Sequence, residues 1–378
     1  MRVALVHDWL TVPGGSEVVL DALLDIYPDA PVHTLLYERA TFRDLPVASR
    51  RIRTSFLNRL PGARRHHRAF VGLFPSAVEQ FDLRGYDVVI SNSCAVGHGV
   101  ITTPDQVHVA YVNRNMQYAW ESYHQDLRSF GVSTGLRGLV ARSVYHYLRL
   151  WDQLAFQRPD VVIANSEYMR RRIAKHYRRD ARVIHPPVAL PTLTPPRDRG
   201  EEYLFVGRLV PVKRVEMLVE AFNALDLPLR IIGDGPEGDH LRRIAGANVE
   251  FCGWQPRPQV IEAMARARAL VLPSDEAFGI AAVEAQSVGA PVIGYARSGV
   301  SEAVIDGETG LLYEDQSKDG LIEAIQRFEA IGAGFDAAAM RRHASNFSVE
   351  RFKEQMQRAV DEAWQGSRSP RGAISRPA

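Results

Sequence analysis

The clearest chemical signature in the chain is a pair of carboxylates, Glu276 and Glu284, that stand eight positions apart. Glu276 lies in a predicted loop, and Glu284 lies one turn inside the helix that follows. An ionised carboxylate only accepts hydrogen bonds, which suits it to the hydroxyl groups of a sugar or a ribose. The backbone N–H groups of Phe278, Gly279 and Ile280 begin the same helix, where they would attract an anion. The plainer alternative is one carboxylate beside the helix dipole and another on an exposed helix face.

Two cations follow an earlier strand in the same half of the chain. Arg208 and Lys213 stand five positions apart in the connection after the strand predicted at 203–206. Open α/β sheets bind their ligands at the carboxyl ends of such strands. A planar guanidinium and a compact ammonium could together neutralise a diphosphate. The alternative is a pair of solvated cations on a surface loop.

A glycine-rich turn follows the first predicted strand. Gly14 and Gly15 precede Ser16, Glu17 and a helical pattern of apolar residues. Glycines let the backbone approach a ligand closely, and a helix start offers its N–H groups to an anion. A tight turn in which the Ser16 side chain caps the helix is an equally good interpretation.

A second glycine-rich turn, GDGPEG at 233–238, matches the G-x-G-x-x-G fingerprint of dinucleotide sites. It follows the second strand of its domain rather than the first, and Pro236 lacks the N–H group that a pyrophosphate would need. We therefore interpret this segment as a turn beside another ligand rather than as a nicotinamide or flavin site.

These groups together describe one class of ligand, a nucleotide diphosphate sugar. Carboxylates would accept hydrogen bonds from its hydroxyls, and cations would neutralise its phosphates. The glycine-rich turns would let it lie close to the backbone. A glycoside hydrolase also uses two carboxylates, but it would leave Arg208 and Lys213 without a role. The chain contains no D-x-D pair, which argues against a transferase that holds its diphosphate through a metal ion. It also contains neither a phosphate-binding G-x-x-x-x-G-K-[ST] loop nor a zinc-site spacing.

The elements that must position these groups follow a regular order. Short apolar β-branched segments alternate with helical patterns, which predicts parallel sheets covered by helices on both faces. The predicted strands are 3–6, 32–35, 87–90, 107–111, 160–164, 203–206, 229–232, 249–252, 269–272, 291–294 and 310–312. A proline-rich, charged segment at 186–200 marks a domain boundary. We predict domains at 1–186 and 187–348, an amphipathic helix at 349–365 and a disordered tail at 366–378.

The composition is that of an ordinary globular protein. Of the 378 residues 46% are hydrophobic and 24% are charged, and the net charge of +2 does not suit a general nucleic-acid binder. Two distant cysteines, Cys94 and Cys252, can build neither a disulfide framework nor a CxxC metal site. No stretch reaches 18 consecutive apolar residues, so we expect a cytoplasmic protein that a membrane holds at most at its surface.

One stretch, from Arg50 to Phe74, concentrates positive charge. It contains seven arginines and the pair His66 and His67, interleaved with aromatic and aliphatic residues, and no acidic residue. Such a stretch could bind an anionic membrane, bind a nucleic acid or simply face water. We favour peripheral attachment to the inner face of the cytoplasmic membrane over a solvated face, and we do not expect a nucleic-acid partner.

The ordered set of motifs resembles the large family 4 of retaining glycosyltransferases, which has the GT-B fold. The matching segments are 14–17 (GGSE), 207–209 (GRL) with Lys213, 233–236 (GDGP), 251–253 (FCG), Glu276 with Glu284, 289–293 (GAPVI), 306–310 (DGETG) and 346–348 (NFS). They follow the family order over residues 2–365. The segment 278–289 (FGIAAVEAQSVG) looks most like bacterial mannosyltransferases that use GDP-mannose to build surface polysaccharides.

The resemblance implies how the diphosphate would be held. Arg208 and Lys213 would neutralise its charge as it leaves, and the backbone N–H groups of Phe278, Gly279 and Ile280 would donate to it. Such enzymes are thought to keep the anomeric configuration, with the leaving phosphate assisting the incoming hydroxyl and without a metal ion. The protein's task is then to stabilise charge on the departing group beside an oxocarbenium-like sugar.

The resemblance also implies contacts to the rest of the donor. Glu284 would hold the ribose and Glu276 the hydroxyls of the transferred sugar. The backbone around Phe251 and Cys252 would bracket the base, and Gly15 would approach the diphosphate from the N-terminal domain. No cofactor is implied, and a GDP-sugar is favoured over a UDP-sugar as donor.

The implied architecture is two Rossmann-like domains with parallel sheets that face a central cleft. The C-terminal helix would cross back onto the N-terminal domain, and closure of the domains would complete the site. The implied reaction moves mannose, or a related hexose, to a lipid-linked saccharide in polysaccharide or O-antigen synthesis.

One position departs from the family pattern. Related enzymes often carry a His after an N-domain strand, and this His contacts the transferred sugar near its C6 hydroxyl. Asn113 stands at that position here. An amide donates and accepts hydrogen bonds but cannot carry a positive charge. Our hypothesis is that the donor sugar differs at C6, as a 6-deoxyhexose does, or that catalysis is tuned differently.

Two other functions stay open. A sugar-nucleotide epimerase can share the same architecture, but it needs an acid–base pair that we cannot place in the sequence. A degenerate transferase could also serve as a non-catalytic GT-B scaffold subunit. The presence of Glu276, Glu284, Arg208 and Lys213 argues against the scaffold, whereas Asn113 leaves it open.

Overall fold

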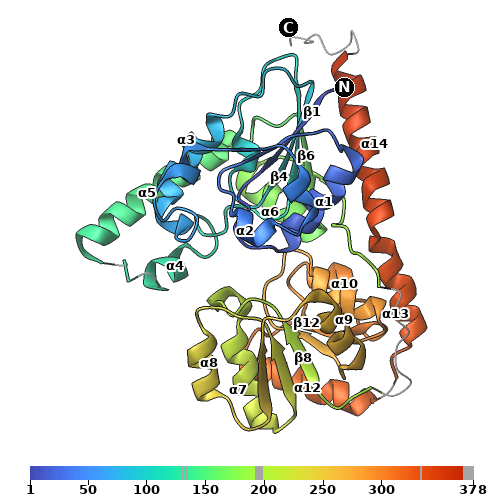
Figure 1. Cartoon of the computed structure of the whole chain (residues 1–378). Helices are drawn as coiled ribbons and strands as arrows, with labels where there is room; N and C mark the ends of the chain where they lie inside the picture. The colour runs from blue at the N-terminus through green and yellow to red at the C-terminus, as the bar shows by residue number, and fades with distance from the viewer. Residues whose placement is uncertain (130, 133, 192–198, 333, 369–378) are drawn as a thin grey trace. The chain divides into compact units, whose positions relative to one another are not determined.

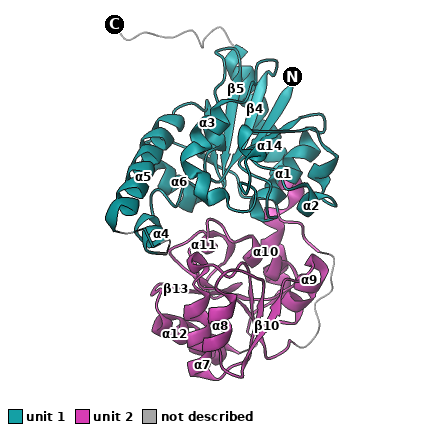
Figure 2. Ribbon diagram, turned by 60° about the vertical axis from the view of Figure 1, so that its left-hand side comes forward, with its two compact units in different colours: residues 1–187, 352–378 teal, residues 188–351 magenta. Residues whose placement is uncertain are grey.

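Two separate parallel sheets organise the chain. The computed structural model describes residues 1–129, 131–132, 134–191, 199–332 and 334–368. The chain divides into two compact units (Figure 2). Unit 1 comprises residues 1–187 and 352–378, and unit 2 comprises residues 188–351. Residues 192–198, within the predicted boundary segment 186–200, lie outside the described residues.

Unit 1 contains a seven-stranded parallel sheet in the order β3-β2-β1-β4-β5-β6-β7. Its strands are β1 (Val3–His7), β2 (Val32–Thr34), β3 (Ile52–Thr54), β4 (Val88–Ser93), β5 (Val107–Val112), β6 (Val161–Ala164) and β7 (Arg182–Val183). Its helices before β7 are α1 (Gly15–Ile26), α2 (Arg39–Phe42), α3 (Phe74–Glu79), α4 (Tyr123–Ser129), α5 (Gly135–Ala155) and α6 (Glu167–Tyr177). Short 3₁₀ segments are η1 (Pro46–Ser49), η2 (Phe56–Arg59), η3 (His67–Leu73) and η4 (Gly97–Gly99).

Unit 2 contains a six-stranded parallel sheet in the order β10-β9-β8-β11-β12-β13. Its strands are β8 (Tyr203–Val206), β9 (Leu229–Ile232), β10 (Val249–Gly253), β11 (Leu270–Leu272), β12 (Val292–Tyr295) and β13 (Gly310–Tyr313). Its helices are η5 (Pro211–Lys213), α7 (Val215–Leu225), α8 (Gly238–Ile244), α9 (Arg257–Arg266), α10 (Ile280–Ser287), α11 (Val300–Ala303), α12 (Lys318–Ile331), α13 (Ala337–Ala344) and η6 (Ser345–Phe347).

Alternating side chains build a core on each face of the unit 2 sheet. Tyr203 and Phe205 point to one face, where α7, α8 and α12 supply the partners. Leu204 and Leu270 point to the other face, which α9, α10 and α13 cover (Figure 1). Burial on both faces explains why these strands are apolar along their whole length.

The predicted fold class, two α/β domains with parallel sheets, is confirmed. Every predicted strand is present, whereas β3 and β7 were not predicted. Both are the edge strands of the unit 1 sheet. Edge strands are short and polar because one side faces solvent, so they lack the apolar run that marks an inner strand. β7 has only two residues, and β3 carries Arg53 and Thr54 on exposed positions.

The last described helix, α14 (Val349–Arg368), packs against unit 1 from Phe352 onward. The Phe352 ring lies edge-on to the Tyr111 ring, with centroids 5.6 Å apart. The helix ends three residues later than predicted, so the first part of the predicted disordered tail is helical. In this added turn, the Arg368 guanidinium lies over the Trp364 ring, 4.6 Å from its centroid. The rest of that tail, 369–378, lies outside the described residues. None of the helices in the described ranges is long and apolar enough to cross a bilayer.

Candidate functional site

The strand order of unit 2 reverses between β8 and β11. The sheet continues to β9 and β10 on one side of this point and to β12 and β13 on the other. The two strands pair at Leu204 and Leu270. Open α/β sheets bind ligands beyond the carboxyl ends of the strands at such a switch point. Arg208 and Lys213 follow β8, and Glu276 follows β11, so three predicted site residues lie there.

Lys213 and Glu276 are in direct contact at this switch point. The distance from Lys213 Nζ to Glu276 Oε1 is 2.6 Å. Ser274 Oγ donates to the same carboxylate oxygen at 2.5 Å. The Lys213 and Glu276 side chains are 25% and 16% exposed, so solvent reaches both. The structure therefore joins the cation predicted for the diphosphate to the carboxylate predicted for the sugar.

Close backbone packing shapes the start of α10. Gly279 precedes the helix with φ 99°, and its carbonyl accepts the Ala282 N–H at 2.9 Å. Gly299 N donates to Glu276 O at 2.7 Å. A Cβ atom on Gly299 would lie 2.1 Å from Ala277 O, so only glycine fits beside this loop. The backbone that carries Glu276 is thus fixed by its neighbours before any ligand binds.

Phe278 and Ile280 flank that turn with apolar side chains. The Phe278 ring is buried and packs against the Phe347 ring, with centroids 5.2 Å apart. Ile280 packs against the same core. Their side chains hold the loop in place, which leaves the backbone N–H groups at the helix start as the part suited to an anion.

Glu284 forms an ion pair that was not predicted. Its Oε1 lies 2.8 Å from Arg257 Nη2 in the first turn of α9. The Glu284 side chain is only 12% exposed. Burial raises the pKa of Glu284, and the nearby Arg257 charge opposes this shift without cancelling it. Arg257 carries no sequence signal, because only the fold brings it to a carboxylate 27 positions away.

The G-x-G-x-x-G turn supports the loop that carries Arg208 and Lys213. A Cβ atom on Gly233 would lie 1.9 Å from Gly207 O, and Gly233 has φ 136°. A Cβ atom on Gly235 would lie 2.2 Å from Leu209 O. Leu209 N donates in turn to Asp234 O at 2.9 Å. The glycines therefore let two backbone turns touch.

Phe251 and Cys252 lie at the carboxyl end of β10. Phe251 packs against the unit 2 core, and the Arg242 guanidinium lies 5.3 Å from its ring centroid. The Cys252 carbonyl accepts a hydrogen bond from Gln255 Nε2 at 2.8 Å. Burial raises the pKa of the Cys252 thiol. Both residues are in place at the strand end, but this carbonyl already has a partner within the chain.

Unit 1 has its own switch point between β1 and β4, where an aspartate secures the loop after β4. The buried Asp8 carboxylate accepts backbone N–H groups from Ala95, Val96 and Gly97 at 3.0, 2.8 and 2.7 Å, and a fourth from Cys94. Four donors on one carboxylate fix this loop relative to β1. Asp8 was not among the site residues predicted from the sequence.

Asn113 and the first glycine-rich turn belong to one hydrogen-bond network. Asn113 Nδ2 donates to Asn92 Oδ1, and Asn92 Nδ2 donates to Ser16 O at 2.7 Å. Gly14 is the N-cap of α1 and Gly15 its exposed first residue, so Ser16 does not cap the helix. Asn92 links these two predicted positions and was missed, although it lies near the carboxyl end of β4, where polar residues are informative.

A buried pair holds the same turn against β1. His7 Nε2 lies 3.0 Å from Glu17 Oε1, and both residues are buried. Burial alone would lower the pKa of His7, but the hydrogen bond and the negative charge of Glu17 outweigh it and raise the pKa. Glu17, which belongs to the GGSE motif, therefore faces a histidine rather than solvent.

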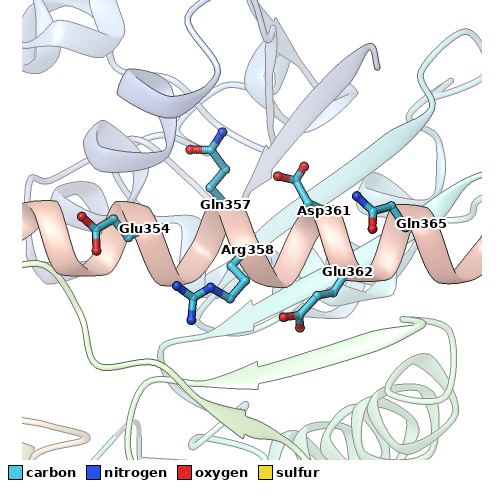
Figure 3. Close-up of a pocket in the computed structure, with 6 residues that line it drawn as sticks. All are labelled: Glu354, Gln357, Arg358, Asp361, Glu362 and Gln365. Atoms are coloured by element: carbon cyan, nitrogen blue, oxygen red, sulfur yellow. The ribbon is translucent and has the colours of Figure 1, made fainter.

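Two other features bear on ligand binding. Within the described ranges, no three His, Cys, Asp or Glu side chains are grouped as metal ligands. A hollow along α14 is lined by polar side chains of that one helix (Figure 3). They are Glu354, Gln357, Arg358, Asp361, Glu362 and Gln365. Glu362 bonds to Arg182 at 2.8 Å, and no predicted site residue lines this hollow.

The basic stretch from Arg50 to Phe74 forms β3, η2 and η3. Leu57 and Phe74 are buried, and Leu60, Phe70 and Val71 pack against the unit 1 core. Only Phe56 and Leu73 among its large apolar side chains are exposed. Most of its apolar residues therefore stabilise the fold, while its arginines lie mainly at the surface.

A family model matches the region that carries this site. Residues 194–346 match the family described as "Glycosyl transferases group 1". This span includes Arg208, Lys213, Glu276 and Glu284. The segment that carries the candidate site is therefore similar to group 1 glycosyltransferases.

Curated relatives match part of the chain. An uncharacterized glycosyltransferase of Methanocaldococcus jannaschii is 32% identical over 182 residues, 47% of this chain and 52% of the relative. The D-inositol 3-phosphate glycosyltransferase of Mycolicibacterium gilvum is 31% identical over 225 residues, 52% of this chain and 50% of the relative. The chain thus spans about half the length of the curated relatives it matches.

Solved structures match nearly the whole chain at lower identity. The lipopolysaccharide outer core galactosyltransferase WaaB is 19% identical with a TM-score of 0.64, over 96% of this chain and 99% of that one. Anabaena HepE, solved with UDP, is 18% identical with a TM-score of 0.68, over 96% and 100%. Sucrose-phosphate synthase from Thermosynechococcus elongatus is 19% identical with a TM-score of 0.71, over 97% and 100%. These likenesses confirm the predicted GT-B fold class.

Proposed function

We propose that the chain is a hexosyltransferase that moves a hexose from a nucleotide diphosphate sugar to a lipid-linked saccharide. The observation that supports this best is the contact between Lys213 and Glu276, 2.6 Å apart at the switch point of unit 2. A cation for phosphate and an acceptor for sugar hydroxyls stand side by side there. The pair also lies inside the span that matches group 1 glycosyltransferases.

The proposed chemistry follows from where charge develops. The bond between the anomeric carbon and the diphosphate breaks, and a bond to the acceptor oxygen forms on the same face. The acceptor proton passes to the leaving phosphate. Arg208, Lys213 and the start of α10 stabilise the growing negative charge, and Glu276 holds the sugar through its hydroxyls. This scheme retains the anomeric configuration and uses no metal ion.

The proposed donor is GDP-mannose or a GDP-linked relative. The support is the resemblance of segment 278–289 to GDP-mannose-dependent enzymes. UDP is the natural comparator, because Anabaena HepE was solved with UDP and UDP-glucose. Asn113, which bonds to Asn92 rather than carrying a charge, supports a 6-deoxyhexose as the alternative sugar. The proposed acceptor belongs to polysaccharide or O-antigen synthesis.

Transfer assays with matched variants test this proposal. The purified chain is supplied with GDP-mannose and a polyprenyl diphosphate saccharide, and GDP and extended lipid are measured together. We expect one GDP per transferred sugar. Lys213→Ala and Glu276→Gln should each lower kcat/KM by about 100-fold, as expected for removing one charge-stabilising group. Arg266→Gln, at an exposed site on α9, should have no effect.

Other outcomes would point to the remaining candidates. Conversion of the donor to an isomeric sugar nucleotide, with no extended lipid, would indicate an epimerase. Tight donor binding without turnover on any acceptor would indicate a scaffold subunit. D-inositol 3-phosphate belongs in the acceptor panel, because several curated relatives carry that name. If the chain used D-inositol 3-phosphate as acceptor, the proposed transferase activity would stand, but the proposed lipid-linked acceptor would be wrong.

A further inference from the structure

One helix of unit 1 carries an unusual share of the exposed apolar surface. Fourteen large hydrophobic side chains are exposed in the described chain, and six of them lie on α5. They are Leu136, Leu139, Val140, Tyr147, Leu150 and Leu154. The two most exposed are Leu136 at 77% and Leu154 at 69%. Isolated exposed leucines are ordinary, but six on one helix form a continuous patch.

The spacing places five of these six side chains in one stripe, and Leu139 lies beside it. Positions 136, 140, 143, 147, 150 and 154 alternate steps of four and three residues, which keeps them on one face of a helix. Ser143 is the single polar member of the stripe. An adjacent face of α5 supplies Leu148, Trp151 and Ala155 to the unit 1 core. The core therefore explains one apolar face of α5 and leaves the other unexplained.

The charge on α5 has one sign at the surface. The helix carries Arg137, Arg142 and Arg149, and its single acidic residue is Asp152. Asp152 is fully buried and accepts hydrogen bonds from Trp120 Nε1 and Tyr177 OH, each at 2.7 Å. No carboxylate of α5 thus reaches solvent beside the apolar stripe.

The basic stretch found in the sequence adjoins this helix. A Cβ atom placed on Gly72 of η3 would lie 3.4 Å from Val144 Cγ1 of α5. Leu73, at the end of η3, is exposed, as are Arg65 and Arg68. Helix α5 lies at the margin of unit 1, beside α3 and α4 (Figure 1). The two segments form what we call the α5 surface: the six exposed apolar residues of α5 with Leu73, Arg65, Arg68, Arg137 and Arg142.

We propose that the α5 surface docks unit 1 onto an anionic lipid bilayer, with α5 lying in the plane of the interface. Leucines would enter the headgroup boundary while the arginines meet lipid phosphates. This assigns the apolar contact to α5, whereas the sequence alone placed it in the stretch from Arg50 to Phe74.

Charge favours lipid over a second copy of the chain as the occupant. Helices that pair through a stripe of this spacing usually carry acidic residues beside it, which pair with basic residues of the partner. The exposed flanks of α5 carry arginine and no acid, so two copies would bring like charges together. An anionic bilayer presents the opposite charge. The proposal does not depend on which sugar the protein transfers.

Vesicle flotation of the full-length chain tests the apolar part. Vesicles of phosphatidylcholine alone are compared with vesicles that also contain phosphatidylglycerol. The variant Leu136→Gln, Leu150→Gln, Leu154→Gln removes three stripe residues. The matched control is Ile101→Gln, Ile305→Gln, Ile331→Gln, three exposed apolar side chains outside α5. We expect wild type and control to float with anionic vesicles only, and the α5 variant to lose binding by about tenfold or more.

A second pair of variants tests the charge. Arg65→Gln, Arg68→Gln, Arg137→Gln should weaken binding to anionic vesicles by about tenfold or more and reduce its salt dependence. The control Arg266→Gln, Arg297→Gln, Arg342→Gln removes three exposed arginines of unit 2 and should bind as wild type does. If the leucine variant had a lower melting temperature than wild type, the arginine variant and its control would decide the test.

Three results would overturn the proposal. The first is equal binding of the α5 variants and their controls to anionic vesicles. The second is wild-type binding that does not depend on phosphatidylglycerol, or no binding at all. The third is a dimer in sedimentation velocity that the leucine variant converts to a monomer, because α5 would then pair with a second copy. These assays need no donor or acceptor, so their failure is distinct from failure of the proposed transferase.

Discussion

Each carboxylate at the proposed donor site has a cationic partner within unit 2. Glu276 meets Lys213 at 2.6 Å, and Glu284 meets Arg257 at 2.8 Å. A partly buried carboxylate without such a partner would tend to take up a proton, and a protonated carboxyl is a poorer acceptor for sugar hydroxyls. The partners therefore prepare the carboxylates for the donor before it arrives.

The carboxylates could be predicted from the sequence, but their partners could not. Glu276 and Glu284 stand at a helix start, where spacing and residue type are informative. Lys213 and Glu276 are 63 positions apart, and both were selected without any sign that they touch. Arg257 lies at the start of a helix rich in charge and looks like any surface arginine. Contacts of this kind depend on tertiary packing, which local patterns do not encode.

The first prediction concerns the pH dependence of nucleotide binding. Burial raises the pKa of Glu284 above its usual 4.5. If the ionised form holds the ribose, affinity for GDP should fall as the pH falls through this raised pKa. Arg257→Met removes a charge that opposes the shift, so the loss should begin at higher pH and reach about tenfold in mild acid. Isothermal titration calorimetry with GDP across pH measures both curves.

Arg266→Gln, at the exposed last residue of α9, is the control for this experiment. It should leave the pH profile unchanged. If Arg257→Met bound GDP with the wild-type profile, Arg257 would have no part in setting the charge of Glu284.

The second prediction concerns the pair of His7 and Glu17. The folded pKa of His7 is raised above 6.5, so the pair stabilises the fold fully below pH 6.5 and less as the pH rises through the folded pKa. Glu17→Gln should lower the free energy of unfolding by about 1.5–3 kcal/mol below pH 6.5, and by less at alkaline pH. Urea unfolding of both proteins across pH provides the measurement.

Glu220→Gln, at an exposed position of α7, should show no such pH-dependent difference. A loss for Glu17→Gln that stayed constant or grew with rising pH would mean that His7 is not charged by this contact.

At the scale of elements, both sheets place polar residues at the same topological position. In unit 1, Asp8 follows β1 and Asn92 lies near the end of β4. In unit 2, Arg208 follows β8 and Glu276 follows β11. The inner strands were predictable because burial on both faces makes them apolar throughout. The edge strands β3 and β7 were not, and neither was the securing of the β4 loop by Asp8, which depends on backbone geometry.

The third prediction separates two explanations of the G-x-G-x-x-G turn. Gly233→Ala and Gly235→Ala place a Cβ atom within 2.2 Å of a backbone oxygen, so each should destabilise unit 2 by about 2–4 kcal/mol. Gly238→Ala places its Cβ atom 3.0 Å from the end of the Arg242 side chain and in ordinary contact with Leu209 Cδ1 at 3.6 Å, so it should change stability by less than about 0.5 kcal/mol. Guanidinium unfolding monitors all three variants. Wild-type stability of Gly233→Ala and Gly235→Ala would contradict the packing role.

At the scale of the whole molecule, the fold class was the most predictable feature. Alternating strand and helix patterns, a proline-rich boundary segment and an ordered set of motifs all indicated the same architecture. The α5 surface was not predicted, because an apolar stripe on a helix normally indicates core. Only the structure shows that a different face of α5 packs against the core, so the exposed stripe is not needed for core packing.

The central claim is that unit 2 binds a nucleotide sugar at its switch point. The most direct measurement is a thermal-shift series with GDP-mannose, UDP-glucose, ADP-glucose and dTDP-glucose on wild type, Glu284→Gln and the control Glu220→Gln. At about 100 times its dissociation constant, a ligand stabilises the fold by about 2.7 kcal/mol. We predict a shift with GDP-mannose that Glu220→Gln keeps and Glu284→Gln loses. A shift with UDP-glucose alone would mean that the donor nucleotide is UDP rather than GDP, while the proposed site would stand. No shift with any nucleotide sugar, or one that Glu284→Gln retains in full, would contradict the account.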